Sequence, residues 1–315
     1  MNLIDVTRDL GTEEECFSFL EKMRWPEGVK CVTCGARRVS RITRVSPSKN
    51  KRAQVYQCLE PTCKQQFSVT SGTIFHDSRI PLSKWFMAIS LVMDAKKGIS
   101  AKQLQQHLGL GSYQTAWHMA HRIREAMQGT AGDLLKGTVE LDETYIGGKT
   151  KRRGRPRNEK PKSERFDMVL GMRERQGRVR FVHIQDGKTE TIRKAVSANV
   201  DPRSAAVYTD SAAVYQFAFH PHLKKRHKMV NHTIEWVVPG TNVHTNTVES
   251  AFSLLKRGLI GSFHRVSIKH LHRYLSEFEH RFNERKNGQR FEDVVSRTAQ
   301  TAPLPYQKLI AEPQA

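Results

Sequence analysis

Over residues 12–23, and again from residue 82 to about residue 127, the chain places apolar side chains at the three- and four-residue spacing of α-helices, while residues 39–45 and 55–57 between them suggest strands. A capping box at Thr12 predicts a helix over residues 12–23. The same spacing predicts a long apolar helix over residues 82–95, and serine caps open two more helices over 101–108 and 112–127. The first half of the chain should therefore be rich in helix.

The last two of these helices, separated by a short glycine-containing turn, have the outline of a helix-turn-helix. In the second helix, Ala116, Ala120 and Ile123 form a stripe that should be buried. An ordinary helical hairpin gives the same pattern, so a DNA-binding role needs support from the charge of the chain. The outer face, which would enter a major groove, carries Tyr113, Gln114, His118, His121, Arg122 and Arg124.

Beyond residue 137 the period changes to the two-residue alternation of β-strands. In the first strand, Val139 and Leu141 face one way while Glu140 and Asp142 face the other. We select Asp142 over Glu143 as the functional carboxylate because it lies opposite the apolar pair, and Glu140 stays as an alternative.

Asp210 ends a second short apolar strand, at a position where ligands of α/β sheets often bind. The two aspartates therefore come from two different strands of the predicted sheet. The pattern predicts strands over residues 138–146, 166–173, 178–185, 205–209 and 234–238, and helices over residues 189–199 and 267–287.

The segment from residue 242 to residue 258 predicts an amphipathic helix with one polar face. Asn246, Glu249 and Lys256 share that face, and Lys256 lies two turns beyond Glu249, so both side chains could meet one anionic ligand. The alternative is a surface helix with a solvated polar side. The apolar side carries Val248, Ala251, Phe252, Leu255 and Leu259.

The charge of the chain changes the picture, because 52 Lys and Arg against 31 Asp and Glu leave a formal charge of +21. Such a surplus predicts a nucleic-acid partner. The sequence has no apolar run long enough to span a bilayer and no signal-like N-terminus, which predicts a cytoplasmic protein without a membrane partner.

Four of the five cysteines form two short knuckles, Cys31 with Cys34 and Cys58 with Cys63. This spacing predicts a tetrahedral Cys₄ zinc ribbon rather than unrelated free thiols. The zinc would be structural, since protein ligands fill all four positions. Cys16 is left over and should pack inside its helix.

A strongly basic loop covers residues 147–165. Its centre, Arg153-Gly154-Arg155-Pro156-Arg157, resembles an AT-hook that lies in a narrow minor groove. A solvated loop that attracts the DNA backbone is the plainer interpretation.

Asp142, Asp210 and Glu249 together suit Mg²⁺, a hard cation that prefers anionic oxygens. Two such ions could activate a hydroxyl nucleophile and stabilise the leaving oxygen of a phosphodiester. The chain has neither a GxSxG nucleophile elbow nor a GxxxxGK[ST] phosphate loop, so a serine hydrolase or an ATPase is not indicated.

The motifs DETYIGGK, YTDS and HTNTVESAFSLLKRG, behind a Cys₄ ribbon and a helix-turn-helix, resemble the DDE transposases of bacterial insertion sequences. The resemblance, to the ISXO type with an N-terminal zinc ribbon, implies an α/β fold with a ribonuclease-H-like mixed sheet flanked by helices. It further implies binding to terminal inverted repeats and Mg²⁺-dependent cleavage and strand transfer, with Mn²⁺ as a substitute ion.

Under this resemblance, Asp142, Asp210 and Glu249 are the catalytic, magnesium-binding triad, and Lys256 with Arg257 contacts the DNA end. Asn246 is the alternative third member, because some relatives have asparagine there. The expected partners are double-stranded DNA, as transposon ends and target, and further copies of the chain in a homodimer or larger assembly, which would place the protein at the bacterial nucleoid.

Two rival functions remain beside the transposase. A catalytically inactive DNA-binding descendant would keep the N-terminal domains, and a nuclease or resolvase would cleave without joining. The domains are an N-terminal helix over 1–27, the zinc ribbon over 28–78, the helix-turn-helix over 79–130, the catalytic domain over 131–300 with its basic loop, and a loose tail over 301–315.

Overall fold

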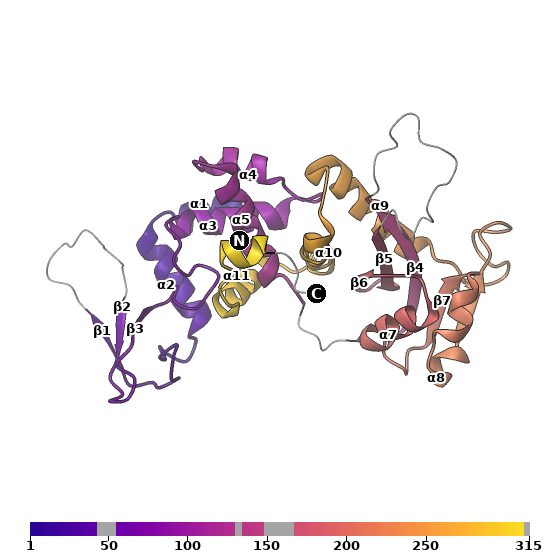
Figure 1. Cartoon of the computed structure of the whole chain (residues 1–315), viewed down its shortest axis with the longest axis horizontal. Helices are drawn as coiled ribbons and strands as arrows, with labels where there is room; N and C mark the ends of the chain where they lie inside the picture. The colour runs from indigo at the N-terminus through magenta and orange to yellow at the C-terminus, as the bar shows by residue number, and fades with distance from the viewer. Residues whose placement is uncertain (43–54, 130–133, 148–166, 312–315) are drawn as a thin grey trace. The chain divides into compact units, whose positions relative to one another are not determined.

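The structure, a computed structural model, describes residues 1–42, 55–129, 134–147 and 167–311 (Figure 1). The chain forms two compact units. Met1–Met127 and Lys286–Ala315 make the first, which we call the N-terminal unit, and Gln128–Arg285 make the second, which we call the sheet unit. The chain therefore leaves the N-terminal unit and returns to it at the end.

The N-terminal unit opens with α1 (Leu3–Asp9) and α2 (Glu13–Arg24). The predicted capping box of α2 is confirmed: the Thr12 hydroxyl accepts a hydrogen bond from the Glu15 backbone N–H, and the Glu15 carboxylate accepts one from the Thr12 N–H. These bonds satisfy donors that a helix start leaves unpaired, which fixes where α2 begins.

A small antiparallel sheet follows, formed by β1 (Val39–Ile42), β2 (Val55–Cys58) and β3 (Gln66–Ser68) in that order. Its buried side rests on three aromatic rings whose centroids are 5.8 to 6.0 Å apart. This aromatic packing joins the ribbon sheet to the end of α2, within the same hydrophobic cluster as the helices of the unit. The rings belong to Trp25, Tyr56 and Phe67.

The predicted helix-turn-helix is present as α4 (Ala101–Leu108) and α5 (Tyr113–Ala126), which pack with α3 (Leu82–Asp94). Gly109 ends α4 in the left-handed region, with φ +57°, where a residue with a side chain would be strained. The Ser112 hydroxyl then accepts a hydrogen bond from the Thr115 N–H and begins α5.

The C-terminal segment differs from the sequence-based layout, which assigned residues up to 300 to the catalytic domain and expected a loose tail. α11 (Arg290–Gln300) belongs to the N-terminal unit, where the ring of Phe291 lies 6.1 Å from that of Phe86. α12 (Tyr306–Ile310) follows, and Leu309 within it and Leu304 just before it are buried. The apolar stripe of α11 needed a core, and the first unit supplies it.

The described part of the sheet unit forms a five-stranded sheet in the order β6-β5-β4-β7-β8. β4 pairs antiparallel with β5, which pairs antiparallel with β6, while β7 and β8 run parallel to β4. This mixed sheet with helices on both faces agrees with the ribonuclease-H-like fold that the sequence predicted. The strands are β4 (Thr138–Ile146), β5 (Asp167–Glu174), β6 (Val179–Ile184), β7 (Ala206–Asp210) and β8 (His227–Val230).

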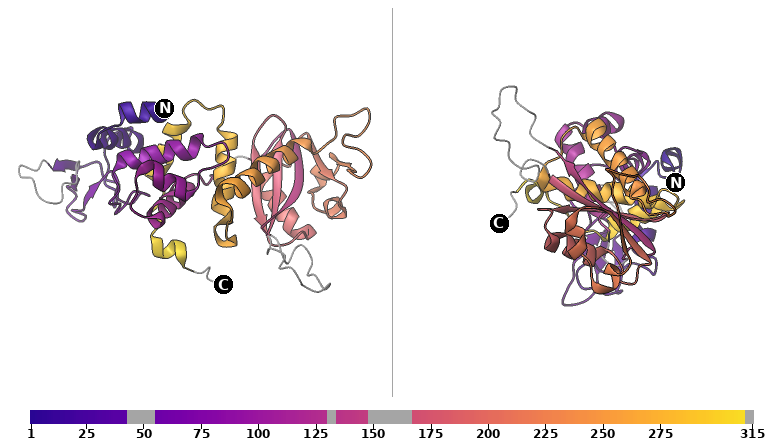
Figure 2. Two further views of the ribbon diagram at one scale, coloured as in Figure 1. Left: turned by 90° about the horizontal axis from the view of Figure 1, so that it is seen from above. Right: turned by 90° about the vertical axis from the view of Figure 1, so that its right-hand side faces the viewer.

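Helices cover both faces of this sheet (Figure 2), and a hydrophobic cluster lies on each face. On one face, α7 (Thr189–Asn199), η1 (Ala213–Phe217) and α8 (Pro221–Lys224) pack against the odd-numbered apolar residues of β4. On the other, α9 (Asn246–Gly258), η2 (Leu259–Phe263) and α10 (Ile268–Asn283) pack against β5 and β6.

The prediction of a strand near residues 234–238 is wrong. The edge strand β8 ends at Val230, and the chain then turns, because the carbonyl of Asn231 accepts hydrogen bonds from the N–H groups of Ile234 and Glu235. Residues 231–245 form a long loop between β8 and α9. The apolar residues that suggested a strand lie in this loop.

Candidate functional site

Asp142 and Asp210 lie on neighbouring parallel strands at the same level of the sheet. The register pairs Val139 with Val207 and Glu140 with Tyr208, so two residues further along each strand come Asp142 and Asp210. Side chains at equal positions on adjacent strands are neighbours. The topology thus brings together two carboxylates that are 68 positions apart in the sequence.

Glu140, two residues before Asp142, fixes the helix that carries Glu249. The side chain of Glu140 is completely buried, and its Oε2 accepts hydrogen bonds from the N–H groups of Thr247 (2.9 Å) and Val248 (3.1 Å) at the start of α9. A carboxylate suits this position because the first N–H groups of a helix are unpaired and carry partial positive charge.

Arg175 balances the buried charge of Glu140. Its Nε donates to Glu140 Oε1 over 2.7 Å, and its Nη2 donates to the carbonyl of His244 over 3.2 Å. Glu140, which the sequence left as an alternative catalytic carboxylate, is therefore occupied in holding β4 to the N-terminus of α9. Its place on the same strand face as Asp142 was the signal for this role.

A glycine allows α9 to approach the sheet at the level of Asp142. Gly171 on β5 pairs directly with Asp142, and a Cβ atom built on it would lie 2.4 Å from the ring of Phe252 and 3.1 Å from Val248. Both of these side chains belong to α9. The absence of a side chain at residue 171 is thus what lets the helix lie close over the carboxylates.

Glu249 projects from the first turns of α9 and has two neighbours that the sequence did not single out. The Thr245 hydroxyl donates to Glu249 Oε1 over 2.9 Å, and His232 Nε2 lies 3.4 Å from the same oxygen and 2.7 Å from the Thr245 hydroxyl. His232 follows β8 and had no sequence signal, because only the fold places it beside α9.

Electrostatics connects the three predicted carboxylates. Burial, together with the negative charges of Asp210 and Glu249, raises the pKa of Asp142 to about 6. Burial likewise raises the pKa of Glu143 to about 7, with added contributions from Asp210 and Asp142. Asp142 therefore lies within electrostatic reach of Asp210 and Glu249, and carboxylate oxygens are the donors that a hard divalent cation prefers.

Glu143 points toward the face opposite Glu140. It lies beside Tyr215, whose ring belongs to the hydrophobic cluster under α7. Strand alternation places Asp142 on the face of α9 and Glu143 on the face of α7. This arrangement supports the choice of Asp142 as the residue that shares a site with Glu249.

The four knuckle cysteines form a second site, in the N-terminal unit. Their Sγ atoms lie within 4.8 Å of one another, with 3.8 Å between Cys31 and Cys63 and 3.6 Å between Cys34 and Cys58. A tetrahedron with Zn–S bonds of about 2.3 Å has edges of about 3.8 Å, so the set fits zinc. Within the described ranges it is the one such gathering of cysteine, histidine or acidic ligands.

The remaining cysteine, Cys16, is a packing residue as predicted. It is buried in α2, and its Sγ lies 3.2 Å from the carbonyl oxygen of Leu10. Burial raises the pKa of its thiol to about 12, so it stays protonated and unreactive.

Two families match the chain in the places where these sites lie. The ISXO2-like transposase domain matches residues 134–283, which hold the carboxylates, and the transposase zinc-ribbon domain matches residues 11–66, which hold the cysteines. Residues 134–283 are thus identified as an ISXO2-like transposase domain, preceded by a transposase zinc ribbon.

A relative of this ISXO2-like chain is an uncharacterized protein in the transposable element ISH50 of Halobacterium salinarum. The two are 29% identical over 281 residues, which cover 85% of the chain and 90% of the relative. No solved structure matches the chain. The resemblance read from the motifs is thereby confirmed at the level of the family.

Only part of the α5 face that the sequence predicted to enter a major groove is exposed. Tyr113 and Gln114, at the start of α5, are exposed. His121, Arg122 and Arg124 are buried instead. The prediction that they face outward is wrong, because α5 packs on more sides than a two-helix outline suggests.

His118 and Arg122 also have partners inside the N-terminal unit. His118 Nε2 is 2.7 Å from the carbonyl oxygen of Leu304, and burial lowers the pKa of its imidazole. Arg122 Nη2 donates to the carbonyl of His76 over 2.9 Å, and its guanidinium lies 5.2 Å from the ring centroid of Trp85. Both side chains stabilise the unit, and they are not displayed for base contacts.

The other predicted DNA contacts have different outcomes. Lys256 and Arg257 are exposed near the C-terminal end of α9, and Asn246 is exposed at its start. The AT-hook-like arginines Arg153, Arg155 and Arg157 lie outside the described residues. No described helix is long and apolar enough to cross a membrane.

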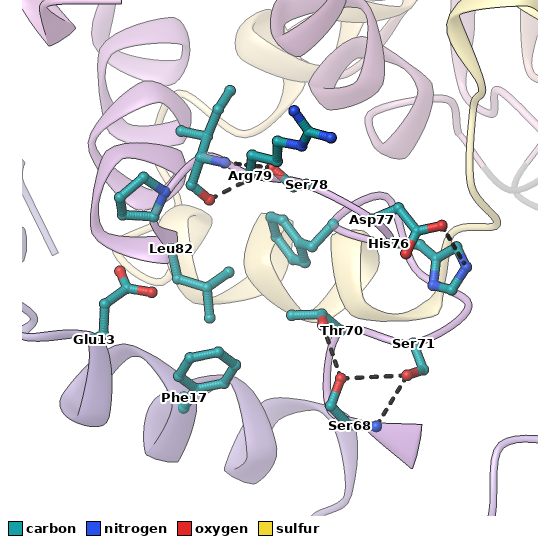
Figure 3. Close-up of a pocket in the computed structure, with 13 residues that line it drawn as sticks. Glu13, Phe17, Ser68, Thr70, Ser71, His76, Asp77, Ser78, Arg79 and Leu82 are labelled. Carbon is teal, nitrogen blue, oxygen red and sulfur yellow. Dashed lines mark hydrogen bonds and ion pairs between the residues drawn. The ribbon is translucent and has the colours of Figure 1, made fainter. Parts of the chain in front are cut away.

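The N-terminal unit also contains a cavity of about 520 Å³ (Figure 3). It lies between α2, the turn after β3 and the start of α3, and it is lined by side chains that include Glu13, Phe17 and Arg79. Glu13 Oε1 accepts a hydrogen bond from the Ser83 N–H and so helps begin α3. None of the predicted catalytic residues lines this cavity, so it is distinct from the carboxylate site.

Proposed function

We propose that this chain is an active DNA transposase that binds the terminal repeats of its own element, cleaves DNA and joins the freed ends to a target. The observation that carries the proposal is the parallel register of β4 and β7, which sets Asp142 level with Asp210, and the charges of Asp210 and Glu249 both act on Asp142. The match to an ISXO2-like transposase domain over residues 134–283 supports the same reaction class.

Asp142, Asp210 and Glu249 would hold the magnesium ions. Bound Mg²⁺ at such a site supplies Lewis-acid stabilisation of a phosphodiester and a stronger oxygen nucleophile. The protein contributes rigid placement: two carboxylates are fixed by the sheet, and the third is oriented by Thr245 and His232. Such positioning lowers the barrier because the groups need not reorganise during the reaction.

Lys256 and Arg257 would bind the phosphates that flank the reacting bond. Lys256 lies seven residues beyond Glu249, which is two turns or about 10.5 Å along the helix. Both side chains are exposed, and they can therefore contact a DNA backbone without a rearrangement of the helix. Tyr113 and Gln114 of the helix-turn-helix are the described residues that would contact base edges, while the zinc ribbon would bind the DNA backbone.

The test is a joining assay with precut terminal DNA, labelled target DNA and Mg²⁺. We expect Asp142→Ala, Asp210→Ala and Glu249→Ala each to reduce joining by about 100-fold or more while end binding persists. Glu190→Ala, which removes an exposed carboxylate of the same unit, is the matched control. Full joining by any of the three variants would remove that residue from the site.

Two further outcomes distinguish the rival interpretations. Loss of joining in Asn246→Ala but not in Glu249→Ala would make Asn246 the third member of the site. Cleavage without joining by the wild-type chain would indicate a nuclease, and binding without either reaction would indicate a non-catalytic DNA-binding protein.

A further inference from the structure

The loop between β8 and α9, residues 231–245, exposes two large apolar side chains. Ile234 is 79% exposed and Trp236 is 68% exposed. Of the four tryptophans in the chain, Trp25 and Trp85 are buried and Trp117 is half-buried, so Trp236 is the most exposed. A large aromatic surface left in water usually marks a place where another molecule binds.

This exposure is not the result of a loose loop. The Asn231 carbonyl accepts hydrogen bonds from two N–H groups in the first turn, and the Val238 N–H donates to the Val243 carbonyl over 3.1 Å. Val243 is 2% exposed, and the Asn242 side chain accepts from the Tyr208 hydroxyl over 3.3 Å. The backbone is therefore held at both ends and presents Trp236 outward.

Trp236 also lies next to the carboxylate site. Its ring centroid is 5.6 Å from that of His232, and His232 Nε2 is 3.4 Å from Glu249 Oε1. Only one side chain separates the exposed indole from a predicted catalytic carboxylate. A DNA end whose phosphodiester reaches Glu249 would bring its adjacent nucleotides to this loop.

We propose that Trp236 stacks on a nucleobase of the DNA end, unpaired from its duplex beside the reacting phosphodiester. The inference rests on the proposed function, because it needs a DNA end at the carboxylates. An indole face suits a base of any identity, since every base offers a flat π-surface. The chain charge of +21 favours nucleic acid over a second protein surface as the occupant.

The experiment uses the full-length chain and a duplex that carries the DNA end protected in a wild-type footprint. 2-Aminopurine replaces one base at a time near the reacting bond, and Ca²⁺ replaces Mg²⁺ during binding. We expect its fluorescence to change at one position with wild-type chain, because the base leaves its neighbours and packs on the indole. Trp236→Ala should lose this signal.

Joining in Mg²⁺ gives the second readout. We expect Trp236→Ala to slow joining by about tenfold and Trp236→Phe by no more than about threefold, since phenylalanine keeps a stacking face. An abasic nucleotide at the responsive position should restore joining by Trp236→Ala, because no base then has to be unstacked. Phe217→Ala is the matched control, since Phe217 is 60% exposed in the same unit and lies beside Lys224 of α8.

The outcomes separate the two proposals. If the wild-type chain neither binds nor joins the end, the proposed function fails. If the wild-type chain joins but Trp236→Ala joins equally fast, or if its defect persists with abasic DNA, the stacking proposal is overturned. A lower oligomer mass of Trp236→Ala in light scattering, with an unchanged 2-aminopurine signal, would assign the indole to a protein contact and also overturn it.

Discussion

Glu140, which the sequence analysis kept only as an alternative to Asp142, holds β4 against the start of α9. Its two oxygens join the strand of Asp142 to the helix of Glu249, and it does so from a position with no solvent exposure. A buried carboxylate is stable only with full compensation, which Arg175 and two helix N–H groups provide.

We therefore predict that Glu140→Ala destabilises the sheet unit by about 3–5 kcal/mol, because it leaves the Arg175 guanidinium without its buried partner. Glu140→Gln should cost less, since the amide oxygen can still accept from the start of α9. Calorimetric unfolding of the variants measures both effects. The exposed Glu190→Ala serves as the control and should stay within about 0.5 kcal/mol of wild type.

Glu279 on α10 predicts a dependence of stability on pH. Burial raises the pKa of Glu279 to about 7, against opposing effects of its hydrogen bond from the Phe181 N–H and of Arg180. The folded state thus holds the proton more tightly than the unfolded state. The stabilisation is complete below the ordinary glutamate pKa and is lost as pH rises through about 7.

Unfolding of wild type and Glu279→Gln between pH 4.5 and 8 measures this contribution. We expect the wild-type sheet unit to lose on the order of 2 kcal/mol over this interval relative to the variant. Parallel curves for the two proteins would show that Glu279 titrates normally.

At the scale of elements, the contact between α9 and β5 sets how near Glu249 comes to the sheet. We predict that Gly171→Ala costs about 1–3 kcal/mol and slows joining, because its methyl group would collide with the ring of Phe252. Phe252→Leu in the same chain should recover part of both losses. Gly261→Ala, which meets no atom within 4 Å, is the control in the same unit.

The zinc ribbon is the element whose stability should depend on a bound ion. Three strands of three or four residues cannot bury enough apolar surface to fold firmly alone. We predict one zinc per chain, and we expect a strong chelator or Cys58→Ser to unfold the ribbon and weaken end binding. Metal analysis and a binding titration measure this, and Cys16→Ala should retain the zinc.

For the whole molecule, the sequence predicted the features that depend on local spacing. The cysteine knuckles, the helix caps and the strand that carries Asp142 could be recognised because each has a signature of a few residues. The strand ending at Asp210 and the amphipathic helix of Glu249 were recognisable for the same reason.

The features that the sequence could not predict depend on contacts between distant segments. The sequence around His232 does not indicate that its side chain contacts Glu249. The sequence around His118 likewise does not indicate that its imidazole hydrogen-bonds the carbonyl of Leu304. The buried face of α5 likewise depends on tertiary packing. Local periodicity therefore overstated how many of its polar side chains reach solvent.

The return of α11 to the N-terminal unit has a consequence for the order of folding. During synthesis every residue of the sheet unit leaves the ribosome before Phe291, Val294 and Val295 do. The unit made first must therefore wait with its apolar core incomplete until the chain is almost finished. A message cut short after the sheet unit would yield a protein with all three carboxylates and an unfinished ribbon-bearing half.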